Sequence, residues 1–112
     1  MTEEKRKKQQ KINAMLVEKG KYKGMKKEEI FELLRKEGFK KIYVWEDYPG
    51  SYYPYHTHDF YSAHIVIEGK IKIRTDDGEF EFMEGDRFDV EKGEKHLAKV
   101  GPEGCVYIVA EK

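Results

Sequence analysis

The chain has 112 residues, the size of one domain, and 38% of them are hydrophobic and 13% aromatic, as in ordinary globular proteins. Charged residues make up 39% of the chain, well above the usual ~25%. The sequence holds no apolar run long enough to cross a membrane, and we expect no signal peptide. These features exclude a membrane-spanning protein, and we expect a cytoplasmic one without a membrane partner.

The composition indicates a thermophilic source, and the cysteine content does not imply an oxidising compartment. The charges are mostly Lys and Glu, while Asn, Gln and Cys are scarce, a composition typical of thermophilic proteins. Cys105 is the single cysteine, so no disulfide can form within the chain. It stands in an apolar run and is expected to be a small buried residue rather than a reactive thiol.

The charges balance overall but are unevenly spread. Residues 1–27 carry ten Lys/Arg against three Glu, whereas residues 28–112 carry twelve against nineteen Asp/Glu. A basic arm of this kind could bind nucleic acid. No aromatic residue interrupts it before Tyr22, so we favour packing on the acidic remainder of the same or a partner subunit over a nucleic-acid partner.

The first 38 residues have the pattern of a helical extension, 1–38. Residues 2–19 are predicted to form a helix, whose narrow apolar stripe consists of Ile12, Met15, Leu16 and the stem of Lys19. Gly20 would follow its end. A second helix is predicted from Lys26 to Glu37, with Gly38 after its last turn.

From residue 39 onward the sequence is that of an all-β barrel or sandwich, 39–112. Short β-branched and aromatic runs alternate with turn signals, of which Asp77–Gly78 is the strongest, and further turns are predicted at Glu68–Gly69 and Gly101–Gly104. The expected strands cover residues 41–45, 52–58, 61–68, 70–74, 79–82, 87–90, 96–100 and 105–109.

All four histidines belong to two places in this region. His56, His58 and His64 lie in one tyrosine-rich run, and His96 lies in a later strand. In a strand, residues i and i+2 point to the same side, so His56 and His58 could converge on one metal ion. If the alternation of side chains continues through the following bend, Ser62 and His64 point to that same side. Tyrosine-rich strands also carry histidines as ordinary hydrogen-bonding residues, and the pair alone leaves this alternative open.

Two spacings around these histidines resemble the motifs of the cupin superfamily. Gly50, His56, His58 and Gly69 match the first motif, G-x5-H-x-H-x3–4-E-x6-G, in every part except the glutamate, where Ser62 stands. The second motif is G-x5-P-x-G-x2-H-x3-N. Its glycines and histidine are matched by Gly85, Gly93 and His96, with Glu91 in place of the proline and Val100 in place of the asparagine.

The resemblance implies an antiparallel jelly-roll barrel of the RmlC-like kind, here with two N-terminal helices. It places a divalent metal inside, bound by His56, His58 and His96, while Ser62 is a poor substitute for the glutamate ligand. Three alternatives follow: His64 replaces the glutamate, three histidines bind the metal and leave open positions, or the barrel binds a small molecule without metal. Imidazole ligands suit Zn, Fe, Ni or Cu.

The function expected from this resemblance falls into two classes. One is a metalloprotein acting on a small organic substrate, and the other is a small-molecule-binding or sensing module without catalysis. The ligand-pocket candidates are Ser62, Tyr53, Tyr61 and Tyr107, and no residue is assigned as a catalytic acid or base. Small cupins commonly form dimers, so a homodimer is expected.

Overall fold

The computed structural model of the protein describes residues 10–12 and 15–112. These residues form eight strands and one helix. In chain order, the elements are β1 (Gln10–Ile12), β2 (Met15–Glu18), α2 (Lys27–Lys36), β3 (Lys41–Asp47), β4 (Tyr52–His56), β5 (Ser62–Thr75), β6 (Gly78–Met83), β7 (Arg87–Val90) and β8 (His96–Glu111).

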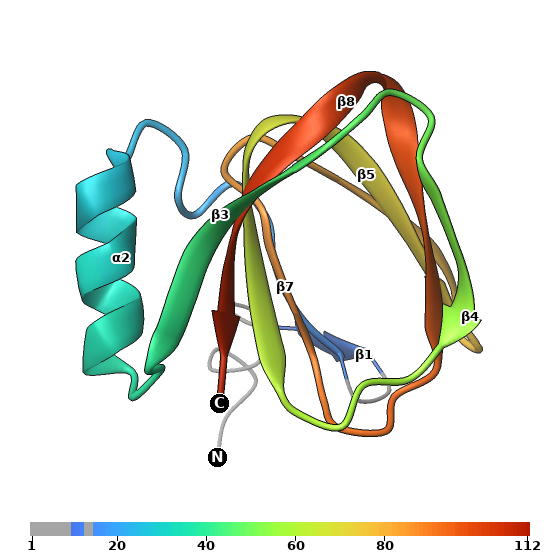
Figure 1. Ribbon diagram of the computed structural model, residues 1–112, viewed down its shortest axis with the longest axis horizontal. Helices are drawn as coiled ribbons and strands as arrows, with labels where there is room; N and C mark the ends of the chain where they lie inside the picture. The colour runs from blue at the N-terminus through green and yellow to red at the C-terminus, as the bar shows by residue number, and fades with distance from the viewer. Residues whose placement is uncertain (1–9, 13–14) are drawn as a thin grey trace.

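Two long antiparallel strands, β5 and β8, organise the barrel (Figure 1). The first half of β5 lies between β7 and the end of β8, and β3 continues that sheet on the far side of β8. The second half of β5 lies between β6 and the beginning of β8, which β4 borders. Each long strand therefore runs through both walls, and the all-β jelly-roll prediction is confirmed.

The two long strands bend where the sequence predicts turns. The β5–β8 register shifts between Val66 and Glu68 and again between Gly69 and Ile71, and pairing continues on both sides. Gly69 has a φ of +83°, and Gly104 in β8 has a φ of +82°. The predicted turns at 68–69 and 101–104 are thus bulges inside continuous strands, because glycine bends the chain there without ending the ladder.

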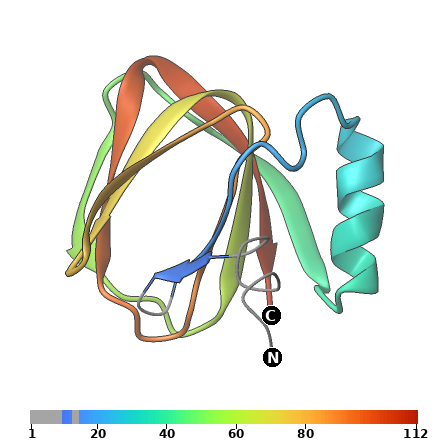
Figure 2. The ribbon, with the colours of Figure 1, turned by 180° about the vertical axis from the view of Figure 1, so that it is seen from behind.

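The prediction of a helix over residues 2–19 is wrong where the structure describes this stretch. Residues 10–12 and 15–18 are strands, and β2 pairs antiparallel with β7 through Met15–Val90 and Val17–Phe88 (Figure 2). Met15 is fully buried, as is most of Val17. The i, i+3, i+4 apolar spacing favours a helix, but β2 lies in the sheet between β1 and β7, and this tertiary pairing decides. Residues 2–9 and 13–14 lie outside the described residues.

The second predicted helix is present as α2, which lies against the outside of the barrel (Figure 1). The Lys26 backbone N–H donates to Glu29 Oε1 at 2.9 Å, which caps its beginning. Ile30 and Leu34 form its buried side. They pack in a cluster with the outward-facing side chains of β5 and β8, namely Ala63, Ile65, Ile108 and Ala110.

A second cluster fills one end of the barrel interior. It contains Met15, Val66, Phe82, Phe88 and Val90 among others, and Cys105 is buried within it as expected of a small apolar residue. The four histidines line a cavity that adjoins this cluster. No helix among the described residues is long and apolar enough to cross a membrane.

Candidate metal centre

Three histidines converge inside the barrel. His56 is the last residue of β4, His96 is the first of β8, and the two are cross-strand partners. His58 follows β4 by two residues, and its backbone carbonyl accepts from Gly93 N–H at 2.9 Å, which ties the two loops together. One ligand nitrogen from each of the three imidazoles lies within 4.8 Å of the others.

The main chain fixes which nitrogen two of these rings present. Nδ1 of His56 lies 2.7 Å from the carbonyl oxygen of Pro54, and Nδ1 of His96 lies 2.9 Å from that of Glu94. A carbonyl oxygen only accepts, so Nδ1 carries the hydrogen and Nε2 keeps its lone pair. Metal-bound histidines are commonly held in this way through the nitrogen that faces away from the ion.

The third ring carries an unsatisfied polar atom. Nδ1 of His58 is buried and has no hydrogen-bond partner among the described residues. Burial lowers the pKa of His58, and charge repulsion from the neighbouring His56 lowers it further. Burial likewise lowers the pKa of His96 to about 4. Both rings are therefore neutral near pH 7, the state in which imidazole can donate to a metal ion.

This set of donors fits a divalent transition metal. Ligand nitrogens bound to one ion at about 2.0–2.1 Å cannot lie more than ~4.2 Å apart, so separations up to 4.8 Å close with small ring rotations. Imidazole donors suit Zn, Fe, Ni and Cu. The cluster is compatible with a metal site made of three histidines.

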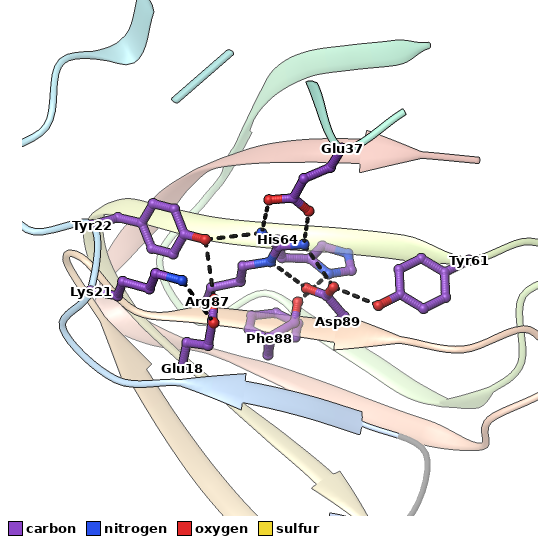
Figure 3. Close-up of polar contacts among 9 residues, drawn as sticks. All are labelled: Glu18, Lys21, Tyr22, Glu37, Tyr61, His64, Arg87, Phe88 and Asp89. Carbon is purple, nitrogen blue, oxygen red and sulfur yellow. Dashed lines mark hydrogen bonds and ion pairs between the residues drawn. The ribbon is translucent and has the colours of Figure 1, made fainter. Parts of the chain in front are cut away.

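His64 lies elsewhere in the same interior, and the structure does not bring it into the group of three. Its Nδ1 is 3.2 Å from the carbonyl oxygen of Phe88, and its ring stacks on Phe88 with centroids 4.5 Å apart (Figure 3). Burial lowers its pKa to about 3. Nε2 is left as an acceptor facing the interior.

A cavity of about 280 Å³ lies beside the three histidines. Of the predicted pocket residues, Ser62, Tyr53 and Tyr107 line it, as do all four histidines. Tyr61 does not; its hydroxyl donates to Asp89 at 2.6 Å (Figure 3). Its ring lies near Phe39. Tyr61 faces the side opposite to Ser62 and His64, as alternation along the strand requires, and it packs with Ala63 in the outer cluster. The remaining wall is mainly apolar and aromatic, formed among others by Tyr43, Trp45, Phe60, Ile73, Phe88 and Val109.

Asp47 organises one wall of this cavity, and sequence reasoning missed it. Its carboxylate accepts from Tyr107 at 2.7 Å, from Trp45 Nε1 at 2.8 Å, and from the Tyr53 hydroxyl. Burial raises the pKa of both tyrosines, which therefore remain protonated donors. The available signal was the spacing of Trp45 and Asp47, since i and i+2 share a face of β3.

Two other charged residues near the motifs have structural contacts. The Asp59 side chain is 95% exposed and lies 3.9 Å from Lys92 Nζ, away from the imidazoles. Arg87 is buried on the opposite side of β7, where it binds Asp89 and Glu37 (Figure 3). Among the described residues, no Lys or Arg side chain lines the cavity.

Comparison with solved structures gives the fold of the barrel a wide context. A protein of unknown function from Rhizobium leguminosarum aligns with a TM-score of 0.59 and 23% identity, over 62% of this chain and 66% of that one. A DUF861 family protein from Thermotoga maritima aligns with a TM-score of 0.59 and 23% identity, over 86% and 97%. The DMSP lyase DddQ from Ruegeria pomeroyi aligns with a TM-score of 0.58 and 19% identity, over 63% and 36%.

At these identities the structural matches establish the fold alone. No curated protein matches the chain. A family model described as the AraC-like ligand binding domain matches residues 42–109, which run from β3 through β8 and include all four histidines. The protein therefore belongs to the family of AraC-like ligand binding domains, within the cupin superfamily.

Proposed function

We propose that the protein binds a divalent transition metal through His56, His58 and His96 and uses the adjoining cavity to bind a small organic molecule beside it. The observation that carries this proposal is the convergence of three imidazoles, two of which are held at Nδ1 by backbone carbonyls. Such an arrangement keeps the lone pairs aimed inward before any ion arrives.

The missing glutamate ligand shapes the expected chemistry. Ser62 stands in its place, so the three protein ligands are all neutral and further positions on the ion stay open to a ligand. A metal bound here would act as a Lewis acid toward an oxygen atom of that ligand. The surrounding aromatic side chains would exclude water and hold the apolar part of the molecule.

His64 is not part of the proposed metal site. Its Nδ1 is engaged by Phe88, and its ring lies outside the group of three ligand nitrogens. Of the alternatives raised by the sequence, we therefore favour three histidines with open positions over a site of four histidines.

A titration of chelator-treated protein with Zn²⁺ or Ni²⁺, followed by calorimetry, tests the proposal. We expect one ion per chain and at least a roughly hundredfold weaker affinity in His96→Ala, because two imidazoles cannot replace three. His64→Gln serves as the matched control and should bind the ion within about threefold of the wild type.

Each result of the titration has a defined meaning. Absence of stoichiometric binding by the wild type would overturn the metal site and leave a metal-free ligand cavity. An equal loss in His64→Gln and His96→Ala would overturn the assignment of three ligands in favour of four.

A further inference from the structure

Ser62 has a buried, unsatisfied hydroxyl beside the cavity. The residue is 1% exposed, and its Oγ has no hydrogen-bond partner among the described residues. It lies near the beginning of β5, between Val90 of β7 and Glu111 of β8, and it lines the cavity. Native structures rarely leave a buried polar atom unpaired, and such an atom calls for an explanation.

His64 lies two residues further along the same face of β5. Its Nδ1–H donates to the Phe88 carbonyl, so the neutral ring offers Nε2 as an acceptor. No hydrogen bond to Nε2 is found among the described residues, and the ring also lines the cavity. Ser62 and His64 thus place one potential donor and one acceptor side by side, because i and i+2 share a face of the strand.

Aromatic and aliphatic side chains surround this pair. Phe88 stacks on the His64 ring, and Tyr107 lies against it edge-on with centroids 5.9 Å apart. Ile73 and Val109 extend the apolar wall. No Lys or Arg of the described residues lines the cavity, so a carboxylate would meet the Nε2 lone pair without a compensating cation.

We propose that Ser62 and His64 form a polar subsite that binds the hydroxyl group of a small, largely apolar ligand, in the cavity that the three-histidine cluster also lines. A hydroxyl satisfies both residues at once: its hydrogen is donated to His64 Nε2, and its oxygen accepts from Ser62 Oγ–H. The subsite deepens the small-molecule part of the proposed function and does not require the metal.

The size and lining of the cavity point to an aromatic alcohol or phenol. An engineered apolar cavity of about 150 Å³ in another protein holds benzene, and the cavity here has a volume of about 280 Å³. A substituted ring therefore has room between the aromatic walls, with its hydroxyl directed at β5.

Phenol and toluene, titrated into metal-free protein and followed by NMR, test the subsite. The two probes have nearly the same shape, and toluene is more strongly expelled from water, so a purely apolar cavity would bind toluene more tightly. We expect phenol to bind about tenfold more tightly than toluene, because only phenol satisfies the buried polar pair. The ¹⁵N signal of His64 Nε2 should shift with phenol alone.

Substitutions of Ser62 and His64 test whether these two residues cause the preference for phenol over toluene. In Ser62→Ala and in His64→Phe, phenol should lose about fivefold or more in affinity while toluene keeps or gains affinity. Ser51→Ala is the matched control, since Ser51 Oγ donates to the Tyr48 carbonyl on the surface, and it should leave both affinities unchanged.

Wild-type protein that binds both probes equally, prefers toluene, or binds neither would overturn the subsite, and this comparison needs no variant to fold. The metal titration fails or succeeds independently. Phenol selectivity without metal binding would remove the metal site alone, and metal binding without phenol selectivity would remove the subsite alone.

Discussion

Three of the four imidazoles direct Nδ1 at a backbone carbonyl oxygen, that of Pro54, Phe88 or Glu94. For His56 and His96 the acceptor lies two residues earlier in the chain, so His56 is held by β4 itself and His96 by the loop that leads into β8. The three rings thereby present Nε2 to the interior as a lone pair. His58 lacks such a partner at Nδ1, and it is the ring that is freest to adjust when an ion or ligand arrives.

The same histidines make the metal-free protein sensitive to acid. The pKa values of His64 and His96 fall to about 3 and about 4 because both rings are buried, whereas an unfolded histidine titrates near ~6.5. Between these values the unfolded chain binds more protons than the folded one, so the free energy of unfolding decreases as pH falls below ~6.5. Above that pH neither state is protonated, and the full stability is present.

We therefore expect the metal-free protein to lose stability between pH 7 and pH 5, with His64 alone contributing about 2 kcal/mol of the loss. Urea denaturation at a series of pH values measures it. In His64→Phe the decrease over this interval should be smaller by that amount, whatever the change in stability at pH 7. Parallel pH profiles for the variant and the wild type would refute the assignment of a suppressed pKa to His64.

At the level of single residues, spacing was informative where a rigid motif fixes geometry. The resemblance to the cupin motifs, which rests on the spacing of Gly50, Gly85 and Gly93, implied that His56, His58 and His96 surround one interior site, and the structure brings the three together. Parity across the bend after His58 correctly put Ser62 and His64 on the inside, but it could not say that His64 would turn its Nδ1 to Phe88. Side-chain partners that lie 24 residues apart leave no local signal.

At the level of elements, a buried ion network joins α2 to the barrel (Figure 3). Arg87 of β7 binds Asp89 through two hydrogen bonds of 2.8 and 2.9 Å and binds Glu37, just after α2, through two of 2.9 Å. Its guanidinium also donates to the Tyr22 hydroxyl at 2.9 Å. One side chain thus connects the N-terminal segment, the helix and the sheet.

The two carboxylates of this network have different environments, which predicts unequal effects of substitution. Asp89 is 1% exposed, so Arg87→Met would leave its charge buried and should cost about 3–5 kcal/mol of unfolding free energy. The Glu37 side chain is 42% exposed, and Glu37→Gln should cost at most ~1 kcal/mol because water can replace the contact.

Arg35→Met is the matched control for Arg87→Met. Arg35 pairs with Glu32 at 3.4 Å on the surface of α2, with its side chain 59% exposed, so its loss should change stability by less than ~0.5 kcal/mol. Denaturant unfolding of the three variants provides the comparison. Similar losses for Arg87→Met and Arg35→Met would show that the network does not stabilise the fold.

The helix α2 could be predicted from its sequence, whereas the strand β2 could not. The amphipathic helix α2 was predicted within one residue at each end, since its apolar side, capping glutamate and terminal glycine are all local signals. For residues 15–18 a narrow apolar stripe suggested a helix, yet pairing with β7 produced a strand. A strand of four residues is too short for its alternation to be recognised in the sequence, and its partner β7 lies some 70 residues away.

The whole molecule depends on β5 and β8 passing from one sheet to the other, and glycine makes that passage possible. Gly69 has a φ of +83°, and a Cβ placed on it would lie 2.1 Å from the carbonyl oxygen of Gly104. Gly93 has an almost equal φ of +81°, but a Cβ there would meet no atom within 4 Å. The two glycines have the same backbone conformation, but only at Gly69 does a neighbouring strand approach closely.

Gly69→Ala and Gly93→Ala therefore separate conformation from packing. Both should lose about 1–2 kcal/mol because L-residues disfavour positive φ. Gly69→Ala should lose several kcal/mol more, because two backbones must move apart at the bend that joins both walls of the barrel and positions β8 beside β4. Guanidinium denaturation measures both losses, and equal losses would show that the bend tolerates a side chain.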